Sequence, residues 1–193
     1  MTPLPKARDA PSLTIYRQGY PGLKDYTRYD ENYQFYSNIK PSAVCSDWID
    51  NLHTTLFGDF DRIDNTIGLV HWLFPIREDP ASAIGAHRLH LQEARLIQNS
   101  DHCMARLELS WRLWLDFLGL DLVDATTGEV ARKPGGYMQR YRNLSDSVKN
   151  QKRTTHVLKS LGELGREQWK GPFVEFLLHE CFQNQLIVGA REA

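Results

Sequence analysis

Histidine and cysteine, the side chains that most often bind metals or act as nucleophiles, are scattered along this chain. His87 and His90 are three residues apart and could share one face of a helix, but the sequence has no H-E-x-x-H and no quartet of His and Cys ligands. The three cysteines are odd in number and form no C-x-x-C, so neither a disulfide framework nor a zinc finger is predicted. We expect packed or surface histidines, buried thiols that act as small apolar residues in a reducing compartment, and no cofactor. The residues concerned are His53, His71, His87, His90, His102, His156, His179, Cys45, Cys103 and Cys181.

Hydroxyl, carboxylate and glycine patterns give no catalytic motif. Ser160 lies within a helical pattern and outside any G-x-S-x-G. Asp59 and Asp61 stand at the expected start of a helix, where carboxylates satisfy free amides and favour the helix dipole. Residues 133–136 (Lys-Pro-Gly-Gly) lack the spacing of a phosphate-binding loop and predict a turn. The sequence therefore predicts a protein that is not an enzyme.

One stretch of the chain carries a strongly asymmetric charge. Residues 132–159 contain eight basic residues and one acidic residue, a net charge of +7 in a chain whose net charge is −1. On a helix, five side chains of this stretch cover an arc of about 120° at 100° per residue. Such an outer face could bind a nucleic-acid backbone, a phospholipid headgroup or an acidic partner, or it could be a solvated face balanced by acidic neighbours. The candidate anion-binding residues are Lys149, Lys152, Arg153, His156 and Lys159.

Length and composition indicate one globular domain. The chain has 193 residues, of which 41% are apolar and 24% charged, typical values for a single folded domain. No apolar run reaches the roughly 18 residues of a transmembrane helix. The polar, proline-containing segment 1–10 has no apolar core of a signal peptide. These features predict an intracellular protein with no transmembrane segment.

The first half of the expected domain contains two helical patterns. Ser46 is expected to cap a helix that stops at Gly58, since a serine hydroxyl can accept a hydrogen bond from a first-turn amide. Residues 60–74 carry apolar side chains at spacings of three and four, which predict one helical stripe. Gly68 weakens this stripe and Pro75 ends it.

The second half has the strongest helical signal. Residues 104–118 place apolar side chains on one face, and Gly119 is a suitable C-terminal residue. Thr127-Gly128 predict a tight turn and one small β-hairpin. Ser145 is expected to cap a helix that runs to Leu164. Further helices are expected at 91–98, at 137–143 and from about residue 171. The chain is thus predicted to be a mostly α, single globular helical domain of about six helices.

An irregular arm rich in tyrosine is expected to precede this domain. Six of the eight tyrosines lie between residues 16 and 36, at a spacing that fits neither a sustained helix nor a strand. A tyrosine ring can be buried while its hydroxyl stays in contact with water, so the arm could pack its rings on the main body. The alternative is a partly disordered tail over residues 1–25. We expect an arm at 1–30 and the helical domain at 31–193.

Two segments are specific enough to indicate a family. Residues 72–78 (WLFPIRE) and 158–165 (LKSLGELG) resemble the conserved N-terminal domain of the opioid growth factor receptor family. Segments 32–36 (NYQFY), 117–120 (FLGL) and, in the middle of the domain, TGEV and YRNL follow in matching order. The resemblance spans about residues 30 to 182 and implies a mainly helical, intracellular domain.

The resemblance also implies a function. Vertebrate members are described as receptors for the pentapeptide methionine enkephalin that restrain cell proliferation, often at the nucleus. It implies a non-enzymatic binding domain for a short peptide or protein partner, in cytoplasm or nucleus, with peripheral membrane association also expected. The candidate peptide-binding residues are Trp72, Arg77 and Glu163, and Gly162 suggests close approach of another helix or of a ligand. The alternatives are an anion- or nucleic-acid-binding module and a purely structural interaction domain. Oligomeric state is left open.

Overall fold

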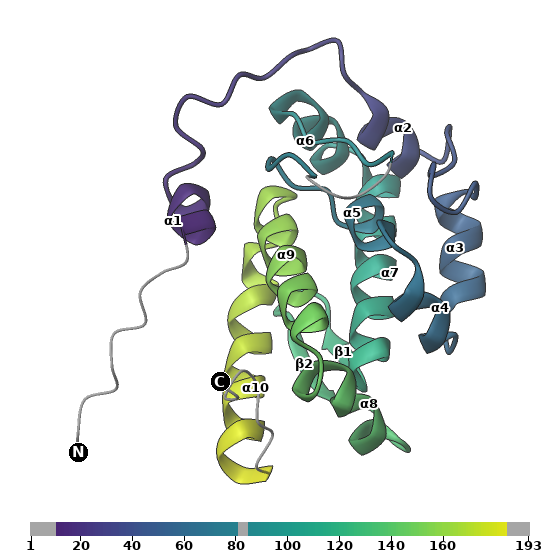
Figure 1. Ribbon diagram of the computed structural model, residues 1–193, viewed down its shortest axis with the longest axis vertical. Coiled ribbons are helices and arrows are strands. Elements are labelled where there is room, and N and C mark those ends of the chain that lie inside the picture. The colour runs from purple at the N-terminus through teal and green to yellow at the C-terminus, as the bar shows by residue number, and fades with distance from the viewer. Residues whose placement is uncertain (1–10, 81–84, 185–193) are drawn as a thin grey trace.

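Helices make up nearly all of the regular structure. The computed structural model describes residues 11–80 and 85–184, so parts of the expected arm and the C-terminal end lie outside the described residues. The described chain contains ten α-helices, six of them with eight residues or more, and one two-stranded hairpin, which confirms the predicted mostly α fold (Figure 1). The helices are α1 (Pro11–Arg17), α2 (Glu31–Tyr36), α3 (Ile49–Leu56), α4 (Phe60–Asn65), α5 (Leu69–Leu73), α6 (Leu91–Gln98), α7 (Asp101–Leu118), α8 (Tyr137–Ser145), α9 (Val148–Glu163) and α10 (Lys170–Asn184), with a 3-10 turn η1 (Glu167–Trp169) before α10.

Helix α7 is the central element. The Ser100 hydroxyl accepts a hydrogen bond from the Cys103 amide at 3.4 Å and begins the helix, and Gly119, at φ 83°, ends it. Eleven of its eighteen residues are buried, which explains why its apolar pattern is the strongest in the sequence. Helices α3, α6 and α8 all contact α7. This helix forms the scaffold against which α2, α3, α6, α8 and the first strand of the hairpin pack (Figure 1).

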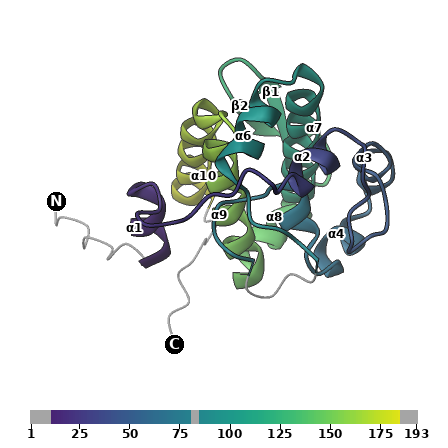
Figure 2. The same ribbon diagram turned by 90° about the horizontal axis from the view of Figure 1, so that it is seen from above.

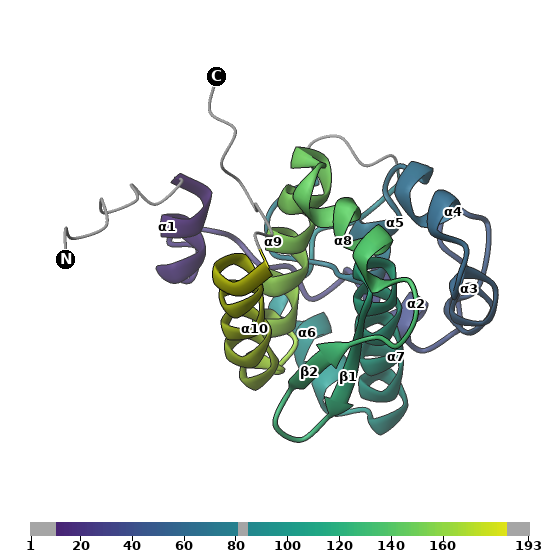
Figure 3. The same ribbon diagram turned by 90° about the horizontal axis from the view of Figure 1, so that it is seen from below.

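The predicted hairpin is confirmed directly after α7. Strands β1 (Leu120–Asp124) and β2 (Glu129–Arg132) pair antiparallel, with an irregularity in register between Leu122 and Asp124. In the turn, Gly128 has a φ of 83°, and a Cβ there would lie 2.6 Å from the Cα of Trp169. The hairpin therefore packs closely against the start of α10, as Figure 3 shows from below.

Three helix boundaries differ from the sequence prediction. Residues 60–74 form two short helices instead of one stripe, because Gly68 adopts φ 86° and turns the chain before α5. Ser46 does not cap α3, since its own φ is 51° and the helix begins three residues later, after Trp48. Ser145 ends α8, and the cap of α9 is Ser147, whose hydroxyl accepts from the Asn150 amide at 3.3 Å.

The tyrosine-rich arm lies against the main body. Helix α1 stands at the edge of the molecule, and the irregular segment 18–30 leads from it across the ends of the helices to α2 (Figures 1 and 2). The arm is therefore irregular apart from the seven residues of α1. None of the helices within the described ranges is long and apolar enough to cross a membrane.

Candidate functional site

The two segments that carry the family resemblance contact one another. The chain after α5 runs beside the C-terminal half of α9, and the Ser160 hydroxyl donates to the carbonyl of Pro75 at 2.8 Å. One residue earlier on α9, the Lys159 ammonium pairs with the Glu78 carboxylate at 2.6 Å. We call this contact between residues 74–78 and residues 156–163 the seam. Residues about 80 positions apart in the sequence thus meet in one largely buried contact.

Glu163 is the acidic centre of the seam. Its carboxylate accepts the backbone amide of Arg77 at 2.7 Å and the Tyr20 hydroxyl at 2.5 Å. Burial raises the pKa of Glu163 to about 7, although both hydrogen bonds and the charge of Arg77 lower that pKa, while the charge of Glu78 raises it. Burial, followed by the Glu163 contact, also raises the pKa of Tyr20, so this phenol keeps its proton and is the donor. The seam therefore presents a carboxyl group that titrates near neutral pH.

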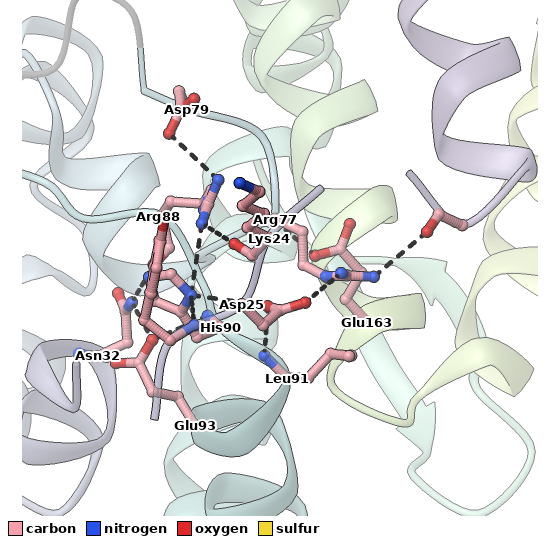
Figure 4. A network of polar contacts seen from close by, with 12 residues as sticks. Lys24, Asp25, Asn32, Arg77, Asp79, Arg88, His90, Leu91, Glu93 and Glu163 are labelled. Carbon is pink, nitrogen blue, oxygen red and sulfur yellow. Dashed lines mark hydrogen bonds and ion pairs between the residues drawn. The ribbon is translucent and has the colours of Figure 1, made fainter. Parts of the chain in front are cut away.

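Arg77 is the cationic group beside that carboxyl. Its guanidinium binds the Asp25 carboxylate at 2.7 Å and donates to the carbonyl of Gly19 at 3.4 Å (Figure 4). The same guanidinium lies over the Tyr20 ring, 5.3 Å from its centroid. Its Nε is buried with no hydrogen-bond partner among the described residues. Arg77 thus holds the arm by a charge and by a ring contact at once.

Asp25 joins the seam to a second network beneath the arm. Its other carboxylate oxygen accepts the amide of Leu91, at the start of α6, at 3.0 Å. It also lies 3.6 Å from the imidazole of His90 (Figure 4). Arg88 donates to the carbonyl of Lys24 at 2.6 Å. The segment around residue 25 is therefore held at several points, whereas α1 contacts the body through its single tyrosine, Tyr16.

Gly162 lies where the arm approaches α9. A Cβ at this position would overlap the Tyr16 hydroxyl and would lie 2.6 Å from a carboxylate oxygen of Glu167. The Tyr16 hydroxyl accepts a hydrogen bond from Lys170 at 3.0 Å. The close approach that the sequence suggested at Gly162 is therefore made by side chains, including one from the arm, and not by another helix backbone.

The structure brings together two of the three candidate peptide-binding residues. Arg77 and Glu163 share the seam, but Trp72 is 2% exposed. Its ring packs edge-on against Phe35 at 5.1 Å and against His87 at 6.0 Å. Trp72 is therefore a core side chain in this structure. Peptide binding by these residues stays a prediction.

The candidate anion-binding residues do not form the outer basic face that the helix pattern suggested. Lys149 and Arg153 lie 2.8 and 3.6 Å from the Asp64 carboxylate, at the end of α4. Lys159 is 6% exposed within the seam. Lys152 is exposed.

His156 also faces inward. Its Nε2 lies 2.7 Å from the carbonyl of Phe74, and burial lowers the pKa of its imidazole to about 3. The face of α9 therefore points partly toward α4 and the seam. Anion binding there stays a prediction, and a polyanion would have to compete with Asp64 for two of the five side chains.

A separate open cleft lies at the end of α7. It includes the glycines of the 133–136 turn, Phe60 and Asn143. Its buried Asp116 is paired with Lys133 at 2.5 Å and with Arg140 at 2.7 Å. Three of the charged groups in this cleft, Asp116, Lys133 and Arg140, are thus engaged with one another. Among the described residues, no three His, Cys, Asp or Glu side chains are grouped so that they could hold a metal ion.

Sequence reasoning missed Tyr20 and Asp25. The tyrosine cluster indicated an arm but did not distinguish the ring that reaches Glu163. The turn residues Gly19, Pro21 and Gly22 around Tyr20 were the sequence feature that could have distinguished this tyrosine. They end the helix and change the direction of the chain at Tyr20, so that its side chain faces the body.

Comparison with known proteins identifies relatives. The family described as the opioid growth factor receptor conserved region matches residues 25–193. The opioid growth factor receptor-like protein 1 of Mus musculus is 34% identical over 189 residues, which are 97% of this chain and 39% of that protein. The opioid growth factor receptor of Homo sapiens is 33% identical over 180 residues, which are 92% of this chain and 26% of that protein. The chain thus spans well under half of the length of these relatives. No solved structure matches it.

Proposed function

Because the chain belongs to the opioid growth factor receptor family, we propose that it is a non-enzymatic binding domain for a short peptide of the methionine enkephalin type. The observation that carries the proposal is the half-buried carboxyl of Glu163 beside the guanidinium of Arg77, both within the seam. By the same resemblance we propose a role in growth regulation within the cell, in nucleus or cytoplasm, with peripheral membrane association.

The chemistry of the seam suits such a ligand. A zwitterionic, aromatic pentapeptide needs an apolar surface for its ring and a charged partner for each terminus. Glu163 can accept from an ammonium or a hydroxyl, and Arg77 can bind a carboxylate and stack on a ring. The contacts with the arm illustrate this chemistry. Glu163 accepts a hydrogen bond from the Tyr20 hydroxyl, and Arg77 binds the Asp25 carboxylate and covers the Tyr20 ring, which are the kinds of group that such a peptide would present.

Isothermal titration with methionine enkephalin tests the proposal, with a scrambled peptide as the comparison. The titration uses the wild-type chain and a Tyr20→Ala chain, because Tyr20 covers the carboxyl. We expect saturable binding of the enkephalin alone, weakened at least about tenfold by Glu163→Gln, as is typical when a charged hydrogen-bond acceptor is lost.

Glu167→Gln is the matched control. This carboxylate lies four residues from Glu163, and its side chain is 72% exposed. We expect it to leave the affinity unchanged. Equal heats for enkephalin and scrambled peptide, on both the wild type and the Tyr20→Ala chain, would remove methionine enkephalin as the ligand.

A further inference from the structure

Tyr20 enters the seam at the cost of an unusual backbone conformation. Its φ is 58°, in the left-handed region that a bulky side chain rarely adopts. Its side chain is nevertheless buried, with the hydroxyl on Glu163 and the ring beneath the guanidinium of Arg77. The side-chain contacts therefore hold this residue against its backbone preference, as expected for a residue that fills a site.

The part of the arm before Tyr20 is attached lightly. Helix α1 has seven residues, too few to be stable by itself. Ile15, an apolar residue of this helix, is 46% exposed. The ring of Tyr16 lies under Lys159 of α9 and Lys170 of α10, and its hydroxyl accepts from Lys170. A segment that buries so little apolar surface can leave and return without unfolding of the core.

The occupant and the site lie on different sides of the boundary of the family model, although the alignment with the mouse relative, over 97% of this chain, includes both. The family match begins at residue 25, so Tyr16 and Tyr20 precede it, whereas Arg77 and Glu163 lie within it. The groups that receive the tyrosine therefore belong to the matched region, and the tyrosine itself comes from outside that region.

We propose that the seam is a tyrosine-binding peptide site that the chain's own arm occupies, and that the arm exchanges with peptides of the same chemistry. The ligand class is a peptide that presents a tyrosine side chain, as the arm presents Tyr20 here, while Asp25 keeps its contacts with Arg77 and Leu91. Glu163 accepts a hydrogen bond from the phenol, and the guanidinium of Arg77 covers the ring. The inference rests on the proposed function, because it names the ligand class of the same site.

Exchange sets a quantitative expectation. A tethered segment competes at an effective concentration of about millimolar, so it masks its site from dilute free peptide. The apparent dissociation constant of an outside peptide equals its intrinsic constant divided by the fraction of time that the arm leaves the site open. Weakening the arm must therefore tighten binding of the outside peptide, which is the opposite of what a purely structural arm would give.

Fluorescence anisotropy with the arm itself as probe tests this expectation. The probe is a labelled synthetic peptide of residues 11–30 of this chain, titrated with the full-length protein. We expect the Tyr20→Ala protein to bind the probe at least about tenfold more tightly than the wild type, since its own arm no longer fills the site. A probe with Phe in place of Tyr20 should bind the same protein more weakly, because it lacks the hydroxyl that donates a hydrogen bond to Glu163.

Tyr26→Ala is the matched control in the protein. It shortens another tyrosine of the arm, which is 46% exposed and packs on Tyr29. We expect wild-type affinity for the probe. If the Tyr20→Ala protein does not fold, Tyr20→Phe takes its place with a smaller gain in affinity.

Two results would overturn the inference: equal affinity of all proteins for the probe, or no binding of the probe to any of them. The enkephalin titration is read separately. Binding of the arm peptide without the enkephalin keeps this site and removes the proposed ligand. Binding of the enkephalin with equal affinity to wild-type and Tyr20→Ala protein keeps the proposed function and removes the exchange.

Discussion

Burial of the Glu163 carboxyl makes the stability of the folded chain depend on pH. Its pKa is raised to about 7 from 4.5, so between these values the folded state holds a proton that the unfolded state releases. The contribution to the free energy of unfolding is present at low pH and is lost as pH rises through about 7. A shift of this size corresponds to about 3 kcal/mol.

We therefore expect Glu163→Gln to gain stability relative to wild type as the pH rises. Glutamine cannot ionise, so the difference in free energy of unfolding should move in favour of the variant by about 3 kcal/mol between pH 4.5 and 8. Urea unfolding of both proteins across this range measures it.

Subtracting the free energy of unfolding of wild type from that of Glu163→Gln removes the contributions that the two proteins share. His53 and His156, whose pKa values burial lowers to about 4 and about 3, destabilise both proteins equally as the pH falls. Glu167→Gln, at an exposed carboxylate, serves as the control for loss of a charge. A difference between Glu163→Gln and wild type that stays constant with pH would show that Glu163 ionises alike in the folded and unfolded chains.

The start of α9 distinguishes two serines that the sequence alone could not rank. Ser147 accepts the Asn150 amide, whereas Ser145 ends α8 and its exposed hydroxyl donates to Asp146. We expect Ser147→Ala to cost about 1 kcal/mol in the free energy of unfolding, and Ser145→Ala only a few tenths. Chemical denaturation of the two variants checks this, and a larger loss for Ser145→Ala would move the helix start back to the predicted position.

Helices were predictable where one regular apolar face decides the structure. The long buried faces of α7 and α9 and the turn at Gly128 follow from local spacing. The break at Gly68 did not, because a glycine in a helical pattern is compatible with either a weak helix or a left-handed turn.

The candidate site was predictable only in part. Arg77 and Glu163 belong to recognisable segments, but nothing local shows that they meet. Lys149, on the basic face of α9, is paired with Asp64, which lies 85 residues away in the sequence, so the helix pattern could not show this contact. Periodicity assigns faces to a helix but does not say which face the rest of the chain will cover.

At the scale of the whole molecule, the arm and the body are coupled through Gly162. A Cβ there would contact Tyr16, Glu167 and Lys170 at the far ends of their flexible side chains. We therefore expect these side chains, and the arm that carries Tyr16, to move while the backbone of α9 stays in place. We expect Gly162→Ala to raise the free energy of unfolding by up to about 1 kcal/mol through helix propensity. At the same time, trypsin should cut the arm at Arg17 faster than in wild type.

Urea unfolding and limited proteolysis measure the two effects. Gly171→Ala is the control, because a Cβ there would meet nothing within 4 Å. It should leave cleavage at Arg17 unchanged. Lower stability of Gly162→Ala with unchanged cleavage would place the strain in the body of α9.

The seam also bears on how the chain is made. Arg77 and Glu163 are 86 residues apart, and Tyr20 and Glu163 are 143 apart. During synthesis at about 5–20 residues per second, the segment around residue 77 waits roughly 4 to 17 s before its partner leaves the ribosome. Apolar side chains of the N-terminal half are without their final neighbours for that interval, and such transiently exposed apolar surface favours aggregation of the nascent chain.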